Sequence, residues 1–414
     1  MRRLIYIFII GLLLCSYTWA DGSRYASKSL LSEGKWVKIR VDKTGIYKLS
    51  YADLKNMGFS DPSKVSVHGY GGWPLDEDFS KEYIDDVPST PVWRGSDYLL
   101  FYGKGPVKWE YDSSSQTFVH TNNPYSLYGY YFVTDATPTN DMTSVAQASG
   151  ASTRITTYDD YLLHEQELVS VNQSGREFFG EDFSGARPRT ISTFSSIPGI
   201  TGADGKVTMR FISRINSGSG TASLSINDSE LLDITIPSIQ TVSSNVRSYT
   251  KAIPGTTTAL WKGSKSEKNN VVVSYSSSGH TNVRLDYIRM QFVRTLRPYG
   301  ACTFFRSLTS VGNASRFVIS EANSNTLVFD VTDALNVKRV EADLNGSELS
   351  FTIPAGRLRE FVLVQTNQTF PSPEVVGEVA SSNLHGLEQR DMIIISAPSL
   401  VQQAERLAVA HREK

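Results

Sequence analysis

The sequence has little cysteine, no excess of charge of either sign, and no long apolar run after its first residues. Its two cysteines are Cys15 and Cys302. Cys15 lies in the N-terminal apolar run, so no internal disulfide is expected once that run is removed. The formal net charge of −1 and the lack of a Lys/Arg-rich block give a nucleic-acid partner no electrostatic support. No later stretch is apolar over the roughly 20 residues that a membrane-spanning helix needs.

The first twenty residues have the pattern of a secretory signal peptide. A basic start at 2–3 precedes the apolar run 4–14, and small residues stand at Thr18 and Ala20. This pattern predicts cleavage after Ala20 and an exported protein, secreted or held at the cell surface or outer membrane. A helix over that run would be only about 16 Å long, which argues against a permanent anchor. A leucine precedes Cys15 where a lipoprotein signal needs a small residue, so lipidation is also disfavoured.

Aromatic and β-branched residues dominate the rest, with 20 Tyr and 19 Phe, which favours β structure. Segments that alternate apolar and polar residues predict a mainly β fold of tandem antiparallel sandwich or jelly-roll-like domains. The aromatic segments 97–103 and 128–133 could suggest an outer-membrane barrel, but their irregular spacing favours sandwich core. A short helix is expected at 51–57, capped by Ser50 with Asp53. The expected divisions are a signal peptide (1–20), an N-terminal β-rich domain (21–157) whose residues 135–157 form a linker or long loop, a jelly-roll-like sandwich (158–298), a small β domain (299–370), a linker (371–390) and the start of an α/β domain (391–414).

An acidic stretch lies within the first domain. It comprises Asp76, Glu77, Asp78, Glu82, Asp85 and Asp86. A Ca²⁺ site needs several oxygens converging at a fixed spacing, and the glycine and terminal glutamate of a calcium-binding loop are missing here. We therefore expect a solvated loop and no metal.

The last residues change in character. Met392-Ile393-Ile394-Ile395 is apolar without alternation, which is typical of a strand buried on both faces of a parallel sheet. Ser399 with Gln402 predicts a capping box, and a helix is expected from 400 to 414. A parallel strand needs a neighbour reached through that helix, and none follows. We therefore expect that this α/β domain is incomplete and that the chain is truncated.

Several segments in order resemble the sortases of the type IX secretion system, which belong to the gingipain-type cysteine peptidases. The resemblance covers nearly all of the mature chain, and the order of the motifs makes it specific. In the segment SGREFFGE (174–181), Phe178 stands where the family usually has tryptophan. The matching segments are GKWVKI (34–39), TGIYKL (44–49), DYLLFYGKGPVKW (97–109), HTNNPY (120–125), YYF (130–132), SGREFFGE (174–181), LDYI (285–288), FDVT (329–332) and NLHGL (383–387).

The resemblance implies that a caspase-like peptidase domain begins near Asp391. The family acts through a His–Cys dyad in which imidazole draws the proton from the thiol and thiolate attacks the peptide carbonyl. Its sortase cuts the C-terminal signal domain from type IX cargo and passes the cargo to an anionic lipopolysaccharide. Cargo proteins, components of the outer-membrane attachment complex and lipopolysaccharide are the implied partners. No catalytic residue can be assigned within this chain, because the family's His and Cys would lie beyond residue 414, and no cofactor is implied.

The candidates inside the chain do not replace that dyad. Cys302 lies in an apolar strand, where a small buried thiol is the ordinary interpretation. His385 precedes the α/β segment, and His411 follows an apolar stripe, where packing or partial exposure is expected. His164, Glu165 and Glu167 lack further ligands with helical geometry, so hydrogen bonds between domains are expected there in place of a metal.

Three functional classes remain open. The first is the N-terminal, non-catalytic part of a surface cysteine peptidase or sortase. The second is an exported adhesin or glycan- or protein-binding sandwich without catalysis, and the third is a structural secretion component. The β-α segment at the C-terminus favours the first, because an adhesin has no use for a single strand and helix.

Overall fold

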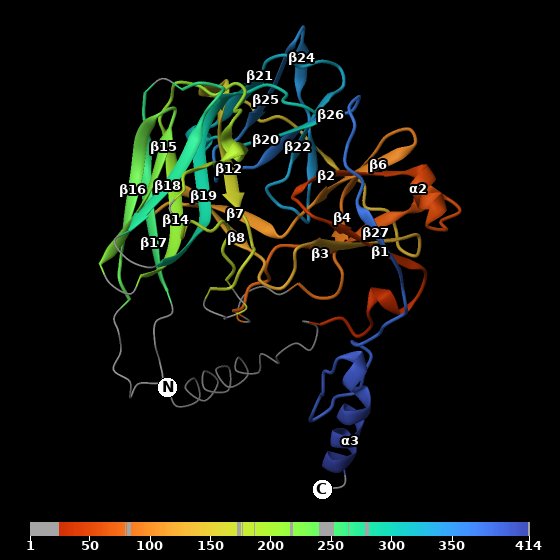
Figure 1. Ribbon diagram of the computed structural model, residues 1–414. Coiled ribbons are helices and arrows are strands. Elements are labelled where there is room, and N and C mark those ends of the chain that lie inside the picture. The colour runs from red at the N-terminus through yellow and green to blue at the C-terminus, as the bar shows by residue number, and fades with distance from the viewer. Residues whose placement is uncertain are drawn as a thin grey trace, which may run out of the picture.

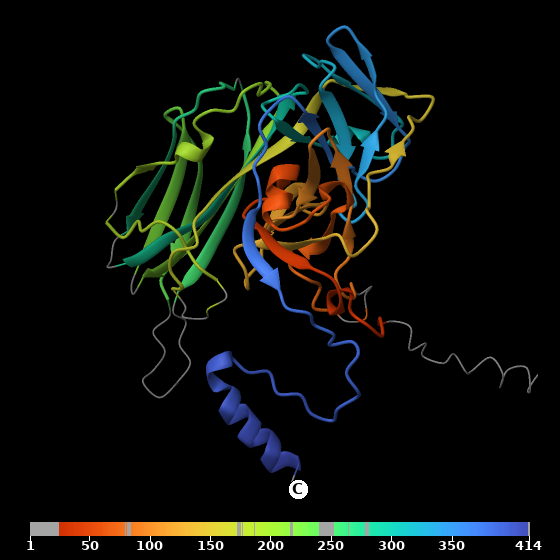
Figure 2. The same cartoon turned by 90° about the vertical axis from the view of Figure 1, so that its right-hand side faces the viewer.

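The computed structural model describes residues 25–412 except 79, 81–83, 172–174, 176, 186, 216–217, 240–251, 264 and 278–280. The predicted signal peptide lies outside the described residues. Three β units pack together, and the C-terminal helix stands apart from them (Figures 1 and 2). The mainly β, largely antiparallel fold expected from the sequence is confirmed. Among the described residues no helix has the length and apolarity to cross a membrane.

The first unit contains a five-stranded sheet, a three-stranded sheet, a hairpin and a short helix. Val37, Ile39 and Val41 alternate along β1 and enter the apolar core shared with the second sheet. Its sheets have the orders β27-β1-β9-β3-β4 and β2-β6-β5. Its elements are η2 (Leu30–Ser32), β1 (Trp36–Val41), β2 (Gly45–Ser50), α2 (Tyr51–Asn56), η3 (Pro62–Lys64), β3 (Ser66–Gly71), β4 (Ser89–Thr90), β5 (Val92–Arg94), β6 (Tyr98–Gly103), β7 (Val107–Asp112), β8 (Thr117–Asn122), β9 (Gly129–Thr134) and β27 (Glu374–Val379).

Helix α2 begins where its sequence predicts. The Ser50 side chain accepts a hydrogen bond from the Asp53 amide at 3.0 Å, and the Asp53 carboxylate accepts from the Ser50 amide in return. These reciprocal bonds satisfy two amides at the helix N-terminus that would otherwise have no partner. Leu54 then faces the core of the first unit.

The second unit is a sandwich of two four-stranded antiparallel sheets, β12-β19-β14-β17 and β13-β18-β15-β16. Met209, Phe211 and Leu224 lie in the apolar core between them. A register shift between Arg210 and Phe211 interrupts the pairing of β14 with β19. Its elements are β12 (Thr157–Glu165), β13 (Arg189–Thr190), η4 (Ser192–Phe194), β14 (Gly205–Ile215), β15 (Ser219–Ile226), β16 (Ser229–Pro237), β17 (Ile253–Trp261), β18 (Val271–Ser277) and β19 (Thr281–Thr295).

The third unit is a smaller sandwich whose core holds a cluster of phenylalanines. The rings of Phe317 and Phe351 stack with centroids 5.2 Å apart, and Phe361 meets Phe351 edge-on. Its sheets have the orders β10-β23-β22-β26-β20 and β11-β21-β25-β24. Its elements are β10 (Ser144–Val145), β11 (Thr153–Ile155), β20 (Cys302–Phe305), η5 (Leu308–Ser310), β21 (Ser315–Ile319), β22 (Thr326–Asp330), β23 (Lys338–Val340), β24 (Asp343–Asn345), β25 (Glu348–Ile353) and β26 (Phe361–Gln365).

Two expected linkers turn out to contain strands. Within 135–157, β10 and β11 pair in parallel with β23 and β21 of the third unit. Within 371–390, β27 pairs antiparallel with β1, so the chain returns to the first unit after leaving the third. The polar or Pro-rich composition of these segments gave no sign of strands. Each strand forms because its backbone finds hydrogen-bond partners at the edge of a sheet built from other parts of the chain.

The C-terminal segment agrees with the sequence only in part. The helix is present as α3 (Val401–Arg412), preceded by η6 (Pro398–Leu400). The expected strand at 392–395 does not form, and the side chains of Ile393 and Ile395 are 78% and 95% exposed. The capping box of Ser399 with Gln402 is also wrong, because Pro398, with its fixed φ, starts the turn earlier and Ala397 is its cap.

Candidate functional site

Cys302 is a structural thiol. It lies at the start of β20, in an apolar cluster that joins the first and third units through Ile46 and Tyr102. Burial raises the pKa of the Cys302 thiol to about 12, although the backbone of Ile46 opposes the shift. A thiol that stays protonated at neutral pH is a poor nucleophile, in agreement with the sequence interpretation.

His164, Glu165 and Glu167 do not form a metal site. His164 bonds within the second unit, with Nε2 2.7 Å from the Glu181 carboxylate and Nδ1 2.8 Å from the Thr193 hydroxyl. Glu165 points to the other face of β12, as strand alternation requires, and lies 3.3 Å from His120. Glu167 accepts a hydrogen bond from the Asn122 amide at 2.9 Å. The two glutamates therefore link the first unit to the second. Among the described residues no group of three or more His, Cys, Asp or Glu could hold a metal.

Within the described residues, the two C-terminal histidines have no hydrogen bond to Cys302. His385 Nε2 lies 3.5 Å from the Asp85 carboxylate of the first unit. His411 is exposed near the end of α3. Of the sortase-like motif at 174–181, Ser174 and Arg176 lie outside the described residues, whereas Phe179 is buried.

The acidic stretch is more than a solvated loop. The Asp76 carboxylate accepts from the Asp78 amide at 3.0 Å, a local turn contact, while Glu82 lies outside the described residues. Asp85 and Asp86 instead bond to the N-terminal segment of the chain. These last two residues are therefore only partly solvated, because backbone amides far away in the sequence reach them.

The three units meet around Arg306, whose side chain is 1% exposed and whose guanidinium lies 5.8 Å from the ring centroid of Phe118 in the first unit. Its Nε donates to Glu360 at 2.6 Å, and one terminal nitrogen donates to the Asp159 carbonyl at 2.9 Å. The guanidinium also lies over the Tyr161 ring, 4.3 Å from the ring centroid. Burial alone would lower the pKa of Arg306, but the nearby Glu360, Tyr161 and Asp160 outweigh burial and raise it. Arg306 therefore stays charged and ties β12 to the third unit.

The β7–β8 hairpin of the first unit packs against the second unit. The Trp109 ring stacks on Tyr161 with centroids 4.0 Å apart. The Gln291 side chain of β19 bonds to both backbone groups of Phe118, at 3.0 and 3.3 Å. Because the Gln291 amide uses both its oxygen and its nitrogen on the backbone of one hairpin residue, this contact fixes where the hairpin lies along strand β19.

Several carboxyl groups lie close together on the outer face of the second unit, beside the β7–β8 hairpin. Burial, followed by the charge of Glu165, raises the pKa of Glu167 to about 7, and the Asn122 bond opposes this rise. Burial likewise raises the pKa of Asp286 to about 6 against the opposing effect of Arg210, with which it forms an ion pair. The register shift of β14 lies next to Arg210, and such irregularities re-aim side chains. This face therefore contains carboxyls that change protonation near neutral pH.

Lys104 is buried where glycine-rich segments cross. An added Cβ at Gly129 would lie 2.0 Å from the Lys104 carbonyl oxygen, and one at Gly71 would lie 2.9 Å from the Lys104 Cβ. The residue is 3% exposed, and its ammonium lies 3.6 Å from the Tyr70 ring centroid and 4.9 Å from that of Trp73. Burial lowers the pKa of Lys104 to about 7, with Asp333 opposing.

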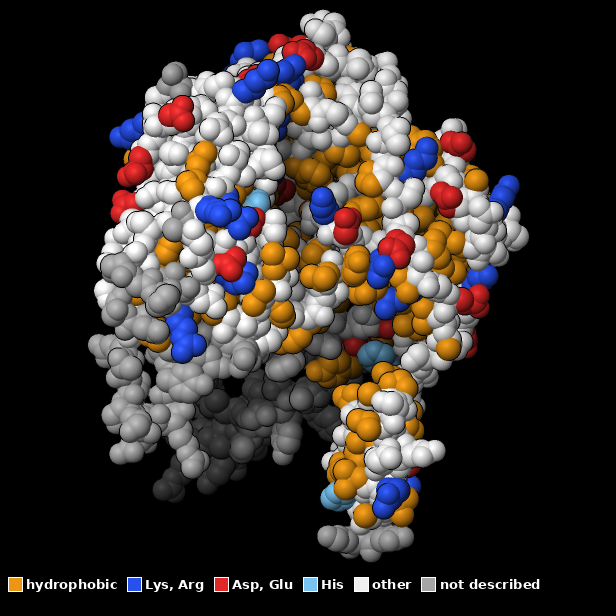
Figure 3. All heavy atoms as spheres, in the orientation of Figure 1, with side chains coloured by type: hydrophobic (Ala, Val, Ile, Leu, Met, Phe, Trp, Pro, Cys, Tyr) orange, Lys and Arg blue, Asp and Glu red, His pale blue; other side chains and the backbone are white. Residues whose placement is uncertain are grey.

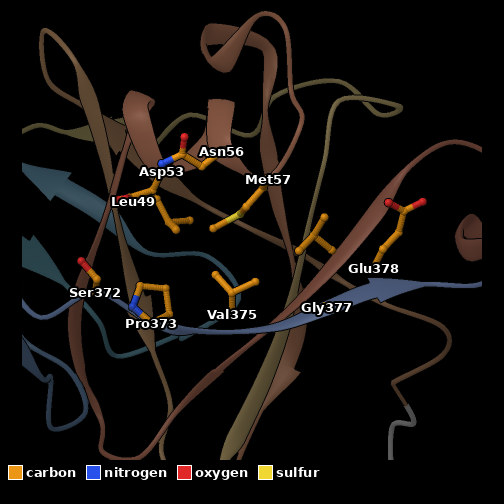
Figure 4. Close-up of a pocket in the computed structure, with 10 residues that line it drawn as sticks. Leu49, Asp53, Asn56, Met57, Ser372, Pro373, Val375, Gly377 and Glu378 are labelled. Atoms are coloured by element: carbon orange, nitrogen blue, oxygen red, sulfur yellow. The ribbon is translucent and has the colours of Figure 1, made fainter.

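One cavity of 420 Å³ lies between α2 and strand β27 (Figure 4). Leu49, Met57 and Val375 form its apolar wall, and Asp53 and Glu378 lie at its margin. The lining residues include no cysteine or histidine. Across the described residues, no thiol lies within hydrogen-bond reach of an imidazole. The described part of the chain thus supplies contacts between units and no assembled nucleophile.

No protein-family model and no curated protein matches the chain. Among solved structures, dimeric latent PorU from Porphyromonas gingivalis matches with a TM-score of 0.83 and 34% sequence identity, over 94% of this chain and 37% of that chain. The insecticidal delta-endotoxin Cry8Ea1 from Bacillus thuringiensis matches with a TM-score of 0.22 and 10% identity, over 55% of this chain and 41% of that chain, which is too weak to support an argument.

The fold defines a mainly β protein made of tandem, mostly antiparallel units. The chain is similar to PorU over nearly all of its length, and its mainly β architecture is consistent with that likeness. It spans 37% of the length of the PorU chain that it matches.

Proposed function

We propose that this chain is the N-terminal, non-catalytic part of a cell-surface gingipain-type cysteine peptidase or sortase. The parent enzyme would remove the C-terminal signal domains of type IX secretion cargo and attach the cargo to the surface, with lipopolysaccharide as the acceptor. The observation that supports this most is the match to PorU over 94% of the chain. The signal-peptide pattern at 1–20 supports export, and N-terminal sequencing of the mature protein should begin at Asp21.

The role proposed for the three β units is to hold the peptidase domain and its cargo in a fixed arrangement. The buried contacts of Arg306 and the Gln291–Phe118 bonds support a rigid arrangement of the units. We also propose that the three β units correspond to the expected divisions 21–157, 158–298 and 299–370. Three strands depart from these divisions: β10 and β11 pair with the third unit, and β27 pairs with the first. The segment from Asp391 would lead into the peptidase domain.

A chimera tests this proposal. The matching part of P. gingivalis PorU is replaced by residues 21–390 of this chain, and processing of a type IX cargo is followed on the cell surface. We expect the chimera to restore cargo cleavage, whereas PorU lacking this part does not. If a chimera that reaches the surface and folds leaves cargo uncut, the proposal is refuted. Glycan binding by the isolated chain in that case would favour an adhesin.

A further inference from the structure

Three segments far apart in the sequence meet at one edge of the first unit. They are residues 26–31, the pair 85–86 from the acidic stretch, and residues 382–385, which follow β27. We call the contact among these three segments the clasp.

Asp86 and Asn383 both bind the N-terminal segment through hydrogen bonds. The Asp86 carboxylate accepts from the Ser29 hydroxyl at 2.7 Å and from the Leu30 amide at 2.6 Å. The Asn383 side-chain oxygen accepts from the Ser29 amide at 2.9 Å. A backbone bond of 3.0 Å from the Ser382 amide to the Leu31 carbonyl completes the contact. Residues 382–385, the start of the C-terminal segment that leaves the β units (the exit segment), are therefore bound directly to the start of the described chain.

Asp85 adds a second connection between the same segments. Its carboxylate accepts from the Ala26 amide at 2.5 Å and lies 3.5 Å from His385 Nε2. The neighbouring Asp86 has a φ of +51°, in the left-handed region that a non-glycine residue enters at a cost. Such a conformation persists where surrounding bonds determine it, and here the two bonds to Ser29 and Leu30 do so.

Among the described residues, the clasp makes the last hydrogen bonds and ion pair between the β units and the C-terminal segment that follows β27. Within the described residues 387–412, the hydrogen bonds and ion pairs are local, such as the Leu387 amide to the Leu384 carbonyl and Arg390 to Glu388. Figure 1 and Figure 3 show α3 projecting below the first unit, with apolar side chains on its surface. The point from which this segment leaves the body is therefore set at 382–385.

We infer that the clasp is a positioning device: the N-terminal segment, held by Asp85 and Asp86, fixes the direction in which residues 387–412 leave the β body. Displacement or proteolytic removal of residues 26–31 frees that segment to reorient. What lies beyond 412 is positioned through it, and only this last consequence rests on the proposed function. The acidic pair thus couples the two ends of the β body.

Distance measurement between spin labels tests the clasp on the full mature chain. Labels at Ser63→Cys on the first unit and Glu405→Cys on α3, in a Cys302→Ser background, report the position of the exit segment. We expect Asp86→Ala to broaden the distance distribution about twofold, because the exit segment loses its anchor. Asn383→Ala, which alters an exposed side chain far from the core, should do the same. Asp135→Ala, an exposed carboxylate outside the clasp, is the matched control.

Amide hydrogen exchange gives a second measurement. Leu30 and Ser382 should exchange about tenfold faster in the Asp86→Ala variant, while strand β1 stays protected. Unchanged distances and unchanged exchange in both variants, with native circular dichroism, would overturn the inference. Neither measurement involves peptidase activity, so the clasp and the proposed function can fail independently of each other.

Discussion

The buried ammonium of Lys104 leads to a prediction about stability and pH. In the unfolded chain a lysine keeps a pKa near 10.5, whereas burial lowers the pKa of Lys104 to about 7 in the folded state. Between these two pH values the unfolded chain binds a proton that the folded chain does not. Stability from this group is therefore present in full above about pH 10.5 and is lost as the pH falls toward 7.

The size of the effect follows from the two pKa values. At about 1.4 kcal/mol per pH unit, the difference corresponds to about 5 kcal/mol of destabilisation below pH 7. We therefore expect Lys104→Met, which keeps the length and removes the charge, to stabilise the first unit by up to about 5 kcal/mol near pH 6.5 and by little near pH 10.

Urea unfolding across this pH range, with a parallel NMR titration of lysine side chains, measures the effect. Lys38→Met is the control, because Lys38 contacts a ring in the same way, 4.0 Å from the Tyr130 centroid, but is only half-buried. The reasoning is refuted if Lys104→Met is no more stable than the wild type near pH 6.5 while its circular dichroism remains native.

Three further predictions concern the junction and the core. Arg306→Met should destabilise the protein by about 3 kcal/mol in thermal unfolding, since the partly exposed Glu360 carboxylate loses its partner, and adding Glu360→Leu should recover most of this; failure to recover would contradict the pairing. The Cys302 thiol should react with a thiol reagent in urea and only slowly in the native protein near pH 8, and rapid native labelling would show that it is accessible. Gly129→Ala should destabilise the protein by more than about 2 kcal/mol, because the new Cβ meets a carbonyl oxygen at 2.0 Å, whereas Gly202→Ala, with open space around it, should have little effect in the same assay.

Local patterns predicted the elements whose partners lie close in the sequence. The Ser50–Asp53 box and the helix at 401–412 follow from capping and periodicity over a few residues. The short strands β10, β11 and β27 escaped prediction, because their pairing depends on sheet edges contributed by distant segments. The apolar segment 392–395 was wrongly predicted as a strand for a related reason. Apolar composition alone does not form a strand without a neighbouring strand to pair with.

The residues of the candidate site also differ in how far the sequence predicted them. Apolar surroundings in the sequence were enough to predict that Cys302 is a packed thiol, and the structure places it half-buried in an apolar cluster. Nothing local showed that Arg306 joins three units, that Lys104 lies in a glycine crossing, or that Asp85 and Asp86 hold both ends of the β body. Composition and periodicity by themselves determined a mainly β chain with an export pattern, since strand propensity and alternation act between neighbours. Only the tertiary structure decided which buried charges find partners, because burial and pairing depend on residues far apart in the chain.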